Sequence, residues 1–400
     1  MLPPLLSPQP LGIFPLPAGY LLLPPVDGVE SVQAALLEGR LPNAFPPALR
    51  FYELALAGDT QAALAALDHD DSPESRYNRF VLEGDPAQYT TLAQTLTGDL
   101  RQLLDVAAYT MGMVERPPER GETAYERLAF VLMAQAAYAL EQNDVKTASA
   151  LLEKGITAAQ TTSPLLAAQL RGTLAETLHS HRGADPIVIQ NYREALRLME
   201  KSDLTLTQAE IWLNLGIAYQ EMANGRRGAL LEASACYQQA LKVFTAADHP
   251  DLYALAHNNL ALAYLAMPLT EASDQLRSAI AIQSLREALR IYTPETNPEQ
   301  WASAQLNLAN ALQYLPSTHP EDNLIQAVEL YEEILATRVR EDDPLGYARL
   351  LANQGNALSH LGIFTHAQTK LEEARALFLS NGEPDTAQSV DELLAGMRDK

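Results

Sequence analysis

The second half of the chain repeats one pattern of small, large apolar and polar positions. In each copy an asparagine stands two residues before a glycine or alanine, and apolar residues follow at helical spacing. The four asparagines are Asn214, Asn259, Asn307 and Asn353, at steps of 45, 48 and 46 residues. Regular steps of this length predict stacked helical hairpins, because one hairpin cannot bury its apolar face without a neighbour.

Each copy is predicted to contain two helices that approach each other closely. The second helix places a large residue between small ones at spacing i, i+4, i+7, as in Ala281, Leu285 and Ala288, which lie on one helix face. The small residues of the first helix are Gly216, Ala261, Ala309 and Gly355. Prolines indicate where three first helices begin, with the preceding Asn or Asp as a cap, at His249-Pro250, Asn297-Pro298 and Asp343-Pro344.

The clearest copy carries Trp212, Leu215, Gly216 and Tyr219 in the order W-x2-L-G-x2-Y. This motif resembles the tetratricopeptide repeat (TPR), in the long-repeat bacterial form found in arrays associated with caspase-like (CHAT) domains. A proline before an aromatic–alanine pair adds to the resemblance, at Pro250 with Tyr253-Ala254, Pro298 with Trp301-Ala302 and Pro344 with Tyr347-Ala348. The resemblance covers about half of the chain. It implies an all-α, right-handed α-solenoid of TPR-like hairpins that binds other proteins and catalyses no reaction.

Composition divides the rest of the chain into regions. Residues 1–26 hold eight prolines among apolar residues, which predicts extended or polyproline-II backbone, with a short strand over residues 19–23. This segment either caps the first helices or binds another protein, and the sequence leaves both roles open. The other predicted regions are an N-terminal helical region (27–115), degenerate TPR-like hairpins (122–203), the TPR array (204–382) and a C-terminal capping helix (383–400).

The net charge of the chain restricts the classes of partner that it is expected to bind. Fifty Asp and Glu residues against 28 Lys and Arg give a net charge of −22, which disfavours nucleic acid as a partner. An acidic surface can attract a basic segment of another protein, or it can simply keep the chain soluble. No Lys or Arg precedes Arg40 and prolines interrupt the first apolar stretch, so neither a secretory signal nor a membrane span is predicted, and the cytoplasm is the expected location.

No sequence motif indicates catalysis. The chain has no phosphate loop, dinucleotide fingerprint or nucleophile elbow, so we expect neither an enzyme nor a cofactor. His179 and His181 are two residues apart, which turns them to different sides of a helix and argues against a shared metal. The single cysteine, Cys236, allows no intramolecular disulfide and is expected to pack in a helix.

A row of asparagines is the best candidate for a binding site. An amide both donates and accepts hydrogen bonds, so a row of them suits the backbone of an extended peptide in the concave groove that first helices line in TPR proteins. The alternative is that these amides bridge neighbouring repeats or cap backbone groups. Arg349 is the one basic candidate, so a carboxylate clamp is not expected. The candidate partner-binding residues are Asn214, Asn259, Asn307, Asn310, Asn353, Asn356 and Arg349.

Three functions follow from these observations. The leading one is a non-enzymatic scaffold or adaptor that holds a partner protein or peptide in the concave groove. A second is an assembly factor or stable subunit of a larger complex, anchored by the proline-rich segment. A third is a regulatory sensor that binds a small molecule or a signalling peptide.

Overall fold

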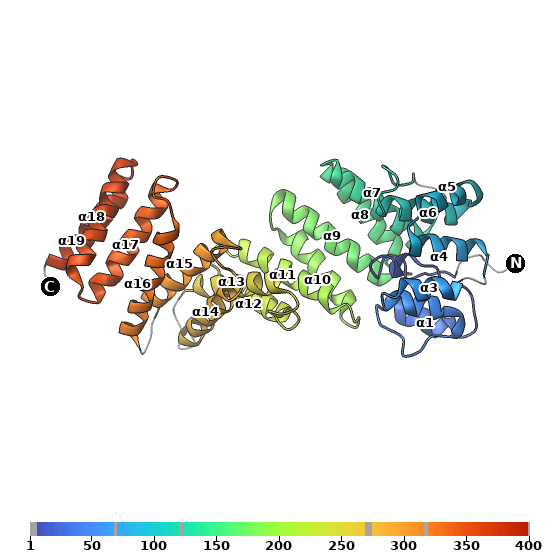
Figure 1. Cartoon of the computed structure of the whole chain (residues 1–400), viewed down its shortest axis with the longest axis horizontal. Helices are drawn as coiled ribbons and strands as arrows, with labels where there is room; N and C mark the ends of the chain where they lie inside the picture. Colours follow the sequence, from blue (N-terminus) through green and yellow to red (C-terminus); the bar gives the residue numbers. More distant parts are fainter. Residues whose placement is uncertain (1–5, 68–69, 120–122, 269–273, 316–318, 399–400) are drawn as a thin grey trace. The chain divides into compact units, whose positions relative to one another are not determined.

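The computed structural model describes residues 6–67, 70–119, 123–268, 274–315 and 319–398. Over these residues the chain forms helices that pack in successive pairs, and no strand occurs in them (Figure 1). The predicted all-α class is therefore confirmed. The chain divides into two compact units, Met1–Met222 and Ala223–Lys400. No helix in the described ranges has the length and apolar character that crossing a membrane requires.

Unit 1 begins with short helices and ends with longer ones that pack each on the next. From α7 onward, successive helices of this unit are in contact. Its helices are α1 (Val29–Leu37), α2 (Arg50–Leu56), α3 (Thr60–Leu67), α4 (Pro73–Glu83), α5 (Pro86–Thr95), α6 (Gly98–Thr110), α7 (Tyr125–Glu141), α8 (Val145–Ala159), α9 (Pro164–Arg182), α10 (Pro186–Met199) and α11 (Thr205–Glu221), with 3-10 turns at Ala18–Tyr20 and Pro47–Leu49.

Unit 2 consists of regular helices, each packed on the following one. They are α12 (Arg227–Ala240), α13 (Pro250–Leu265), α14 (Asp274–Leu289), α15 (Pro298–Tyr314), α16 (Pro320–Thr337), α17 (Pro344–His360), α18 (Phe364–Ser380) and α19 (Pro384–Arg398). The predicted starts at Pro250, Pro298 and Pro344 are confirmed.

Side-chain capping at these starts is only partly as predicted. The Asp343 carboxylate accepts a hydrogen bond from the Gly346 N–H at 2.8 Å, as expected of a cap. The prediction is wrong for Asn297, whose side chain makes no capping bond and accepts instead from the Thr296 hydroxyl. The Asn297 side chain is thus directed toward Thr296 and not toward the first turn of α15.

Small residues bring the two helices of a hairpin together, as their spacing predicts. Ala281, Ala309 and Ala327 are completely buried in one apolar cluster that runs from α13 to α19. At Gly355 of α17, an added Cβ would lie 2.7 Å from the Leu371 Cγ of α18 and 3.2 Å from the Ala367 carbonyl oxygen. Only glycine fits at this approach without displacing the neighbouring helix.

Residues 6–26, the described part of the proline-rich segment, contribute to the core of unit 1. Leu11, Ile13 and the run 21–23 are almost fully buried. The Tyr20 ring packs edge-on against Phe130 of α7, with ring centroids 4.8 Å apart. The Gln169 amide of α9 donates to the Ile13 carbonyl at 3.0 Å. The segment therefore contributes apolar side chains to the interior, and its backbone is held by helices that follow much later in the chain.

The strand predicted over residues 19–23 is wrong. Ala18–Tyr20 form a 3-10 turn, and Leu21–Leu23 run on without a neighbouring strand. The side-chain amide of Asn78 on α4 takes the place of a strand, because it accepts from the Leu22 N–H at 2.8 Å and donates to the Leu22 carbonyl at 3.0 Å. The Gln9 amide oxygen accepts from the Leu23 N–H at 2.9 Å. Side chains thus satisfy backbone groups that burial would otherwise leave unpaired.

Replacing the close-approach glycine tests the packing of the hairpin. Gly355→Ala is expected to lower the free energy of unfolding by about 1–3 kcal/mol, because its Cβ would press on Leu371 and the α18 backbone. Urea denaturation followed by circular dichroism measures this. Gly228→Ala in α12 is the matched control, since its Cβ meets no atom within 4 Å. The control should leave stability unchanged or raise it by up to about 1 kcal/mol. Equal stabilities of the two variants would contradict the close approach.

Replacing Asn78 tests how the proline-rich segment is held. Asn78→Ala leaves the buried N–H and carbonyl of Leu22 without partners, which is expected to cost about 2–4 kcal/mol of stability. Hydrogen exchange at the Leu22 amide should accelerate more than exchange in unit 2. Asn43→Ala, at an exposed position of the same unit, should change neither. Unchanged exchange at Leu22 in the Asn78→Ala protein would show that the amide does not hold the segment.

Candidate functional site

The predicted partner-binding residues fall into both units. Asn214 lies on α11 in unit 1, whereas Asn259 of α13 lies in unit 2 with the remaining five. Asn307 and Asn310 come from α15, and Asn353, Asn356 and Arg349 come from α17. All the asparagines are half-buried, and Arg349 is exposed. We call the asparagines of α13, α15 and α17 the amide row, and its members are Asn259, Asn307, Asn310, Asn353 and Asn356.

Two hydrogen bonds join the amide row of α15 to that of α17. The Asn353 side-chain N–H donates to the Asn310 amide oxygen at 3.2 Å, and the Asn356 side-chain N–H donates to the Tyr314 hydroxyl at 3.2 Å. These partners are 43 and 42 residues apart in the chain, close to the length of one repeat. The polar faces of neighbouring first helices therefore meet, and three asparagines of the row take part in bridging.

A buried tyrosine supports the same contact from the second helix. Tyr331 of α16 is fully buried, and its hydroxyl donates to the Asn310 amide oxygen at 2.6 Å. Burial raises the pKa of Tyr331, so the hydroxyl stays protonated and able to donate. The same hydroxyl lies 2.9 Å from the Gln313 amide oxygen, while the Gln313 amide nitrogen has no partner. Because a hydroxyl has one proton, turning the Gln313 amide over lets its nitrogen donate to Tyr331.

Bridging leaves part of every amide in the row unused. Each asparagine amide has two N–H donors and an oxygen with two lone pairs. Among the described residues, no bond involves the Asn310 nitrogen or the oxygens of Asn353 and Asn356. Asn307 makes no side-chain hydrogen bond to any described residue, and Asn259 accepts only a long one, 3.5 Å, from Asn258. Donors and acceptors therefore remain for a ligand on a half-exposed face.

Adjacent carboxylates on α16 and the histidine His179 are the residue types that acid–base or metal chemistry would use, and each has a structural partner. The Gln354 amide and the Lys370 ammonium hold the Glu332 carboxylate at 2.6 and 3.1 Å, and these hydrogen bonds keep its pKa below the usual range. The Glu333 carboxylate accepts from the Gln305 amide. The His179 ring nitrogen lies 2.9 Å from Glu221 of α11. These contacts join neighbouring helices. The aromatic residues Trp301 and Tyr347 also pack in the apolar cluster of unit 2.

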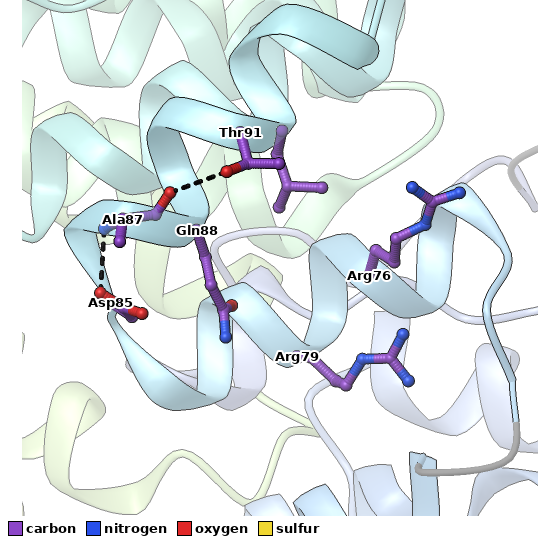
Figure 2. A pocket seen from close by; sticks show the side chains of 7 residues that line it. Arg76, Arg79, Asp85, Ala87, Gln88 and Thr91 are labelled. Carbon is purple, nitrogen blue, oxygen red and sulfur yellow. Dashed lines mark hydrogen bonds between the residues drawn. The ribbon is translucent and has the colours of Figure 1, made fainter.

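A pocket of about 370 Å³ lies between α4 and α5 in unit 1 (Figure 2). Arg76 and Arg79 line it from α4, and Asp85, which precedes α5, and Gln88 of α5 line its other side. The Asp85 carboxylate caps α5 by accepting from the Ala87 N–H at 2.9 Å. Sequence reasoning did not identify this pocket, because its residue types match no motif.

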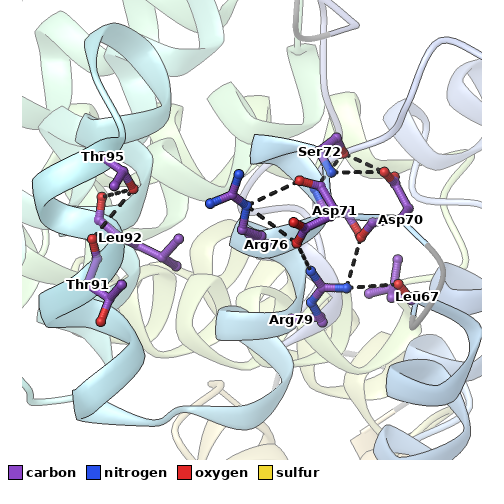
Figure 3. A network of polar contacts seen from close by, with 10 residues as sticks. Leu67, Asp70, Asp71, Ser72, Arg76, Arg79, Thr91, Leu92 and Thr95 are labelled. Atoms are coloured by element: carbon purple, nitrogen blue, oxygen red, sulfur yellow. Dashed lines mark hydrogen bonds and ion pairs between the residues drawn. The ribbon is translucent and has the colours of Figure 1, made fainter.

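The two arginines of this pocket hold the chain between α3 and α4 (Figure 3). The Arg79 guanidinium donates to the carbonyls of Leu67 and Asp70, at 2.9 and 2.8 Å, and pairs with the Asp71 carboxylate at 3.0 Å. Arg76 donates to the Asp71 carbonyl at 3.2 Å. The bond to Leu67 places a cation at the carboxyl end of α3, where the helix dipole favours it. The charge of both arginines is therefore used within the fold.

Among known proteins, this chain is similar only to solved structures, and the similarity is in the fold. No family model matches the chain, and no curated protein matches it. Similar solved structures include PilF of Pseudomonas aeruginosa (16% identity, 66% of this chain and 97% of that chain, TM-score 0.40) and the C-terminal part of a TPR repeat-containing protein of Cytophaga hutchinsonii (15%, 74% and 95%, TM-score 0.37). Another is a Rap protein in complex with competence and sporulation factor (12%, 88% and 96%, TM-score 0.38). Similarity at this level concerns the fold alone.

Proposed function

We propose that this chain is a non-enzymatic scaffold that holds an extended segment of a partner protein along the amide row of unit 2. The observation that carries the proposal is the set of unused amide donors and acceptors on α13, α15 and α17. Bridging bonds fix the positions of Asn310, Asn353 and Asn356, so little side-chain entropy remains to be lost when a ligand binds. The row therefore presents preorganised partners for peptide backbone.

Asn78 provides a physical precedent within the same molecule. Its single amide pairs with both the N–H and the carbonyl of Leu22, in a backbone segment that has no strand beside it. An asparagine of the amide row has the same groups and can hold a partner's backbone in the same way, independently of the partner's side chains. The net charge of −22 favours partner segments that carry Lys or Arg and disfavours nucleic acid. No cofactor enters this function.

The other two candidate functions have less support. An assembly factor anchored by residues 1–26 needs their apolar side chains to be available, yet Leu11, Ile13 and Leu21 are buried in unit 1. A small-molecule sensor that acts through the pocket between α4 and α5 would need polar groups to spare there, and its two arginines are bonded to the preceding loop. The scaffold function uses groups that are half-exposed and unpaired, and it is therefore preferred.

Asparagines that do not bridge repeats give the sharpest test of the amide row. Peptides selected from a display library of short unstructured sequences should bind the purified chain in a fluorescence anisotropy assay. The double change Asn259→Ala with Asn307→Ala should weaken that binding at least about tenfold, or ~1.4 kcal/mol, because it removes two backbone partners. Thermal stability should change little, since neither side chain bonds to another repeat.

The matched control is Asn323→Ala on α16, a half-buried asparagine of a second helix with no side-chain bond to any described residue. This variant should bind the selected peptides as well as the original protein does. If the double variant binds equally well, recognition lies elsewhere on the chain. If no peptide can be selected at all, the scaffold function itself is contradicted.

The change Tyr331→Phe tests whether Tyr331 only holds the amide row in place or also contacts the bound peptide. The change removes the donor to Asn310, so it should lower the free energy of unfolding by about 1–2 kcal/mol. Peptide affinity should fall less than threefold, because the bond between Asn353 and Asn310 still orders the row. Chemical denaturation and anisotropy measured on the same samples distinguish the two effects. Lost affinity with unchanged stability would mean that Tyr331 itself contacts the peptide.

A further inference from the structure

A second pocket, in unit 1, has a basic lining in an otherwise acidic chain. It has a volume of about 830 Å³ and is formed by side chains of α9, α10 and α11. Arg171 of α9 and Arg193 and Arg197 of α10 line it, with Glu194 as the one carboxylate. The side chains of Ile189 and Tyr219 form an apolar and an aromatic part of the pocket wall. We call this pocket the arginine hollow.

Two of the three guanidinium groups form no ion pair with any carboxylate that the structure describes. Arg197 forms a two-fold ion pair with Glu194, with N–O distances of 2.8 and 2.6 Å. Arg193 is exposed and has no hydrogen bond or ion pair with any residue that the structure describes. Hydrogen bonding to Arg197 and the nearby charge of Arg171 lower the pKa of the Glu194 carboxyl. Among the described residues, however, Arg171 donates only to the neutral Asn191 amide oxygen, at 3.2 Å, and its buried Nε has no partner there. The charge of the lining is therefore about +2, from three arginines and one glutamate.

The pocket between α4 and α5 shows how this chain treats arginines that serve the fold. There Arg79 donates to two carbonyl oxygens and pairs with the Asp71 carboxylate, so its positive charge is balanced within the fold. A buried guanidinium nitrogen without a partner costs free energy, and the chain has 50 acidic residues from which a partner could come. The uncompensated donors of the arginine hollow therefore indicate a ligand that brings its own anionic oxygens.

We infer that the arginine hollow binds an acidic polypeptide segment, whose carboxylates pair with Arg193 and Arg171. A guanidinium presents two parallel N–H donors that match a carboxylate. Arg193 and Arg197 are four residues apart on α10, so their side chains lie on one face about 6 Å apart at the helix surface. Carboxylates on neighbouring turns or alternate residues of a ligand match that spacing. The methylene groups of the ligand's glutamates can pack on Ile189 and Tyr219.

The size and setting of the hollow favour a peptide over nucleic acid. Three arginines offset by a glutamate are too few for the many phosphate contacts that nucleic-acid binding requires, and the net charge of −22 repels a long polyanion. A short acidic segment carries far less total charge and experiences mainly the local field. This site is distinct from the amide row, because its charged side chains belong to unit 1 and the amide row belongs to unit 2.

The test uses the full chain and two fluorescent peptides, one of alternating Glu and Ala and one with Gln in place of every Glu. At low salt the Glu peptide should bind with a micromolar dissociation constant and the Gln peptide at least tenfold more weakly. Arg193→Glu should weaken binding of the Glu peptide at least tenfold. Glu194→Gln should tighten it severalfold, because Arg197 is released from its ion pair. A gain in affinity cannot result from misfolding.

Arg116→Glu is the matched control. Arg116 is exposed in the same unit, has no bonded partner among the described residues, and its replacement changes the charge of the chain by the same amount. This variant should bind the Glu peptide within about twofold of the original protein, apart from weak long-range charge effects. Equal losses in the Arg193→Glu and Arg116→Glu proteins would overturn the inference, as would equal binding of the Glu and Gln peptides. Binding of a phosphoserine peptide without binding of the Glu peptide would likewise overturn the assignment to carboxylates.

Discussion

The close approach of paired helices at small residues is the constraint on which the repeats of this chain depend. Gly355 leaves no room for a side chain against Leu371, and Ala281, Ala309 and Ala327 are fully buried in the same apolar cluster. Because successive helical residues are separated by about 100°, a residue two positions before the small one is turned some 200° away from the contact. The asparagine at that position therefore faces away from the paired helix. The constraint that closes each hairpin thus also orients three members of the amide row, Asn259, Asn307 and Asn353.

The proline-rich segment has to meet a different requirement. It buries apolar side chains, and its backbone N–H and carbonyl groups must still find hydrogen-bond partners. Leu11, Ile13 and Leu21 of this segment are buried, yet its prolines prevent a helix and no strand of the described residues lies beside it. Backbone groups in such a segment need partners, and the amides of Asn78, Gln9 and Gln169 supply them. An amide is suited to this because it has a donor and an acceptor in one plane. The same property makes asparagine useful for a ligand that arrives in extended form.

The repeats and helix starts could be predicted from the sequence because they follow a local period. Hydrogen bonds between residues far apart in the chain could not be predicted in this way. The repeat length, the small residues and the helix starts at Pro250, Pro298 and Pro344 follow from local spacing, and the structure has all three. The strand over residues 19–23 was wrong because the partner of Leu22 is one side chain 56 residues away, which no local pattern reveals.

The sequence also could not show which asparagines of the amide row form hydrogen bonds, because these bonds join different repeats. Nothing in the spacing distinguishes Asn307, which lacks a bond to the described residues, from Asn353, which bonds to Asn310. The arginine hollow escaped sequence reasoning for the same reason. The sequence shows the spacing of Arg193 and Arg197. It does not show that Arg171 of α9 lines the same pocket or that Arg197 forms an ion pair with Glu194.

The two candidate sites differ in the chemistry by which they would recognise a partner. The amide row offers neutral donors and acceptors, which pair with backbone and discriminate little between sequences. The arginine hollow offers charge, and charge selects a partner by its side chains. What sets the arginine hollow apart is that three arginines line one pocket together with a single carboxylate, in a chain with almost twice as many acidic as basic residues. Arg193 and Arg171 form no ion pair with a described residue, and apolar side chains line the same pocket, so one site combines attraction for an anion with a surface for its carbon chain.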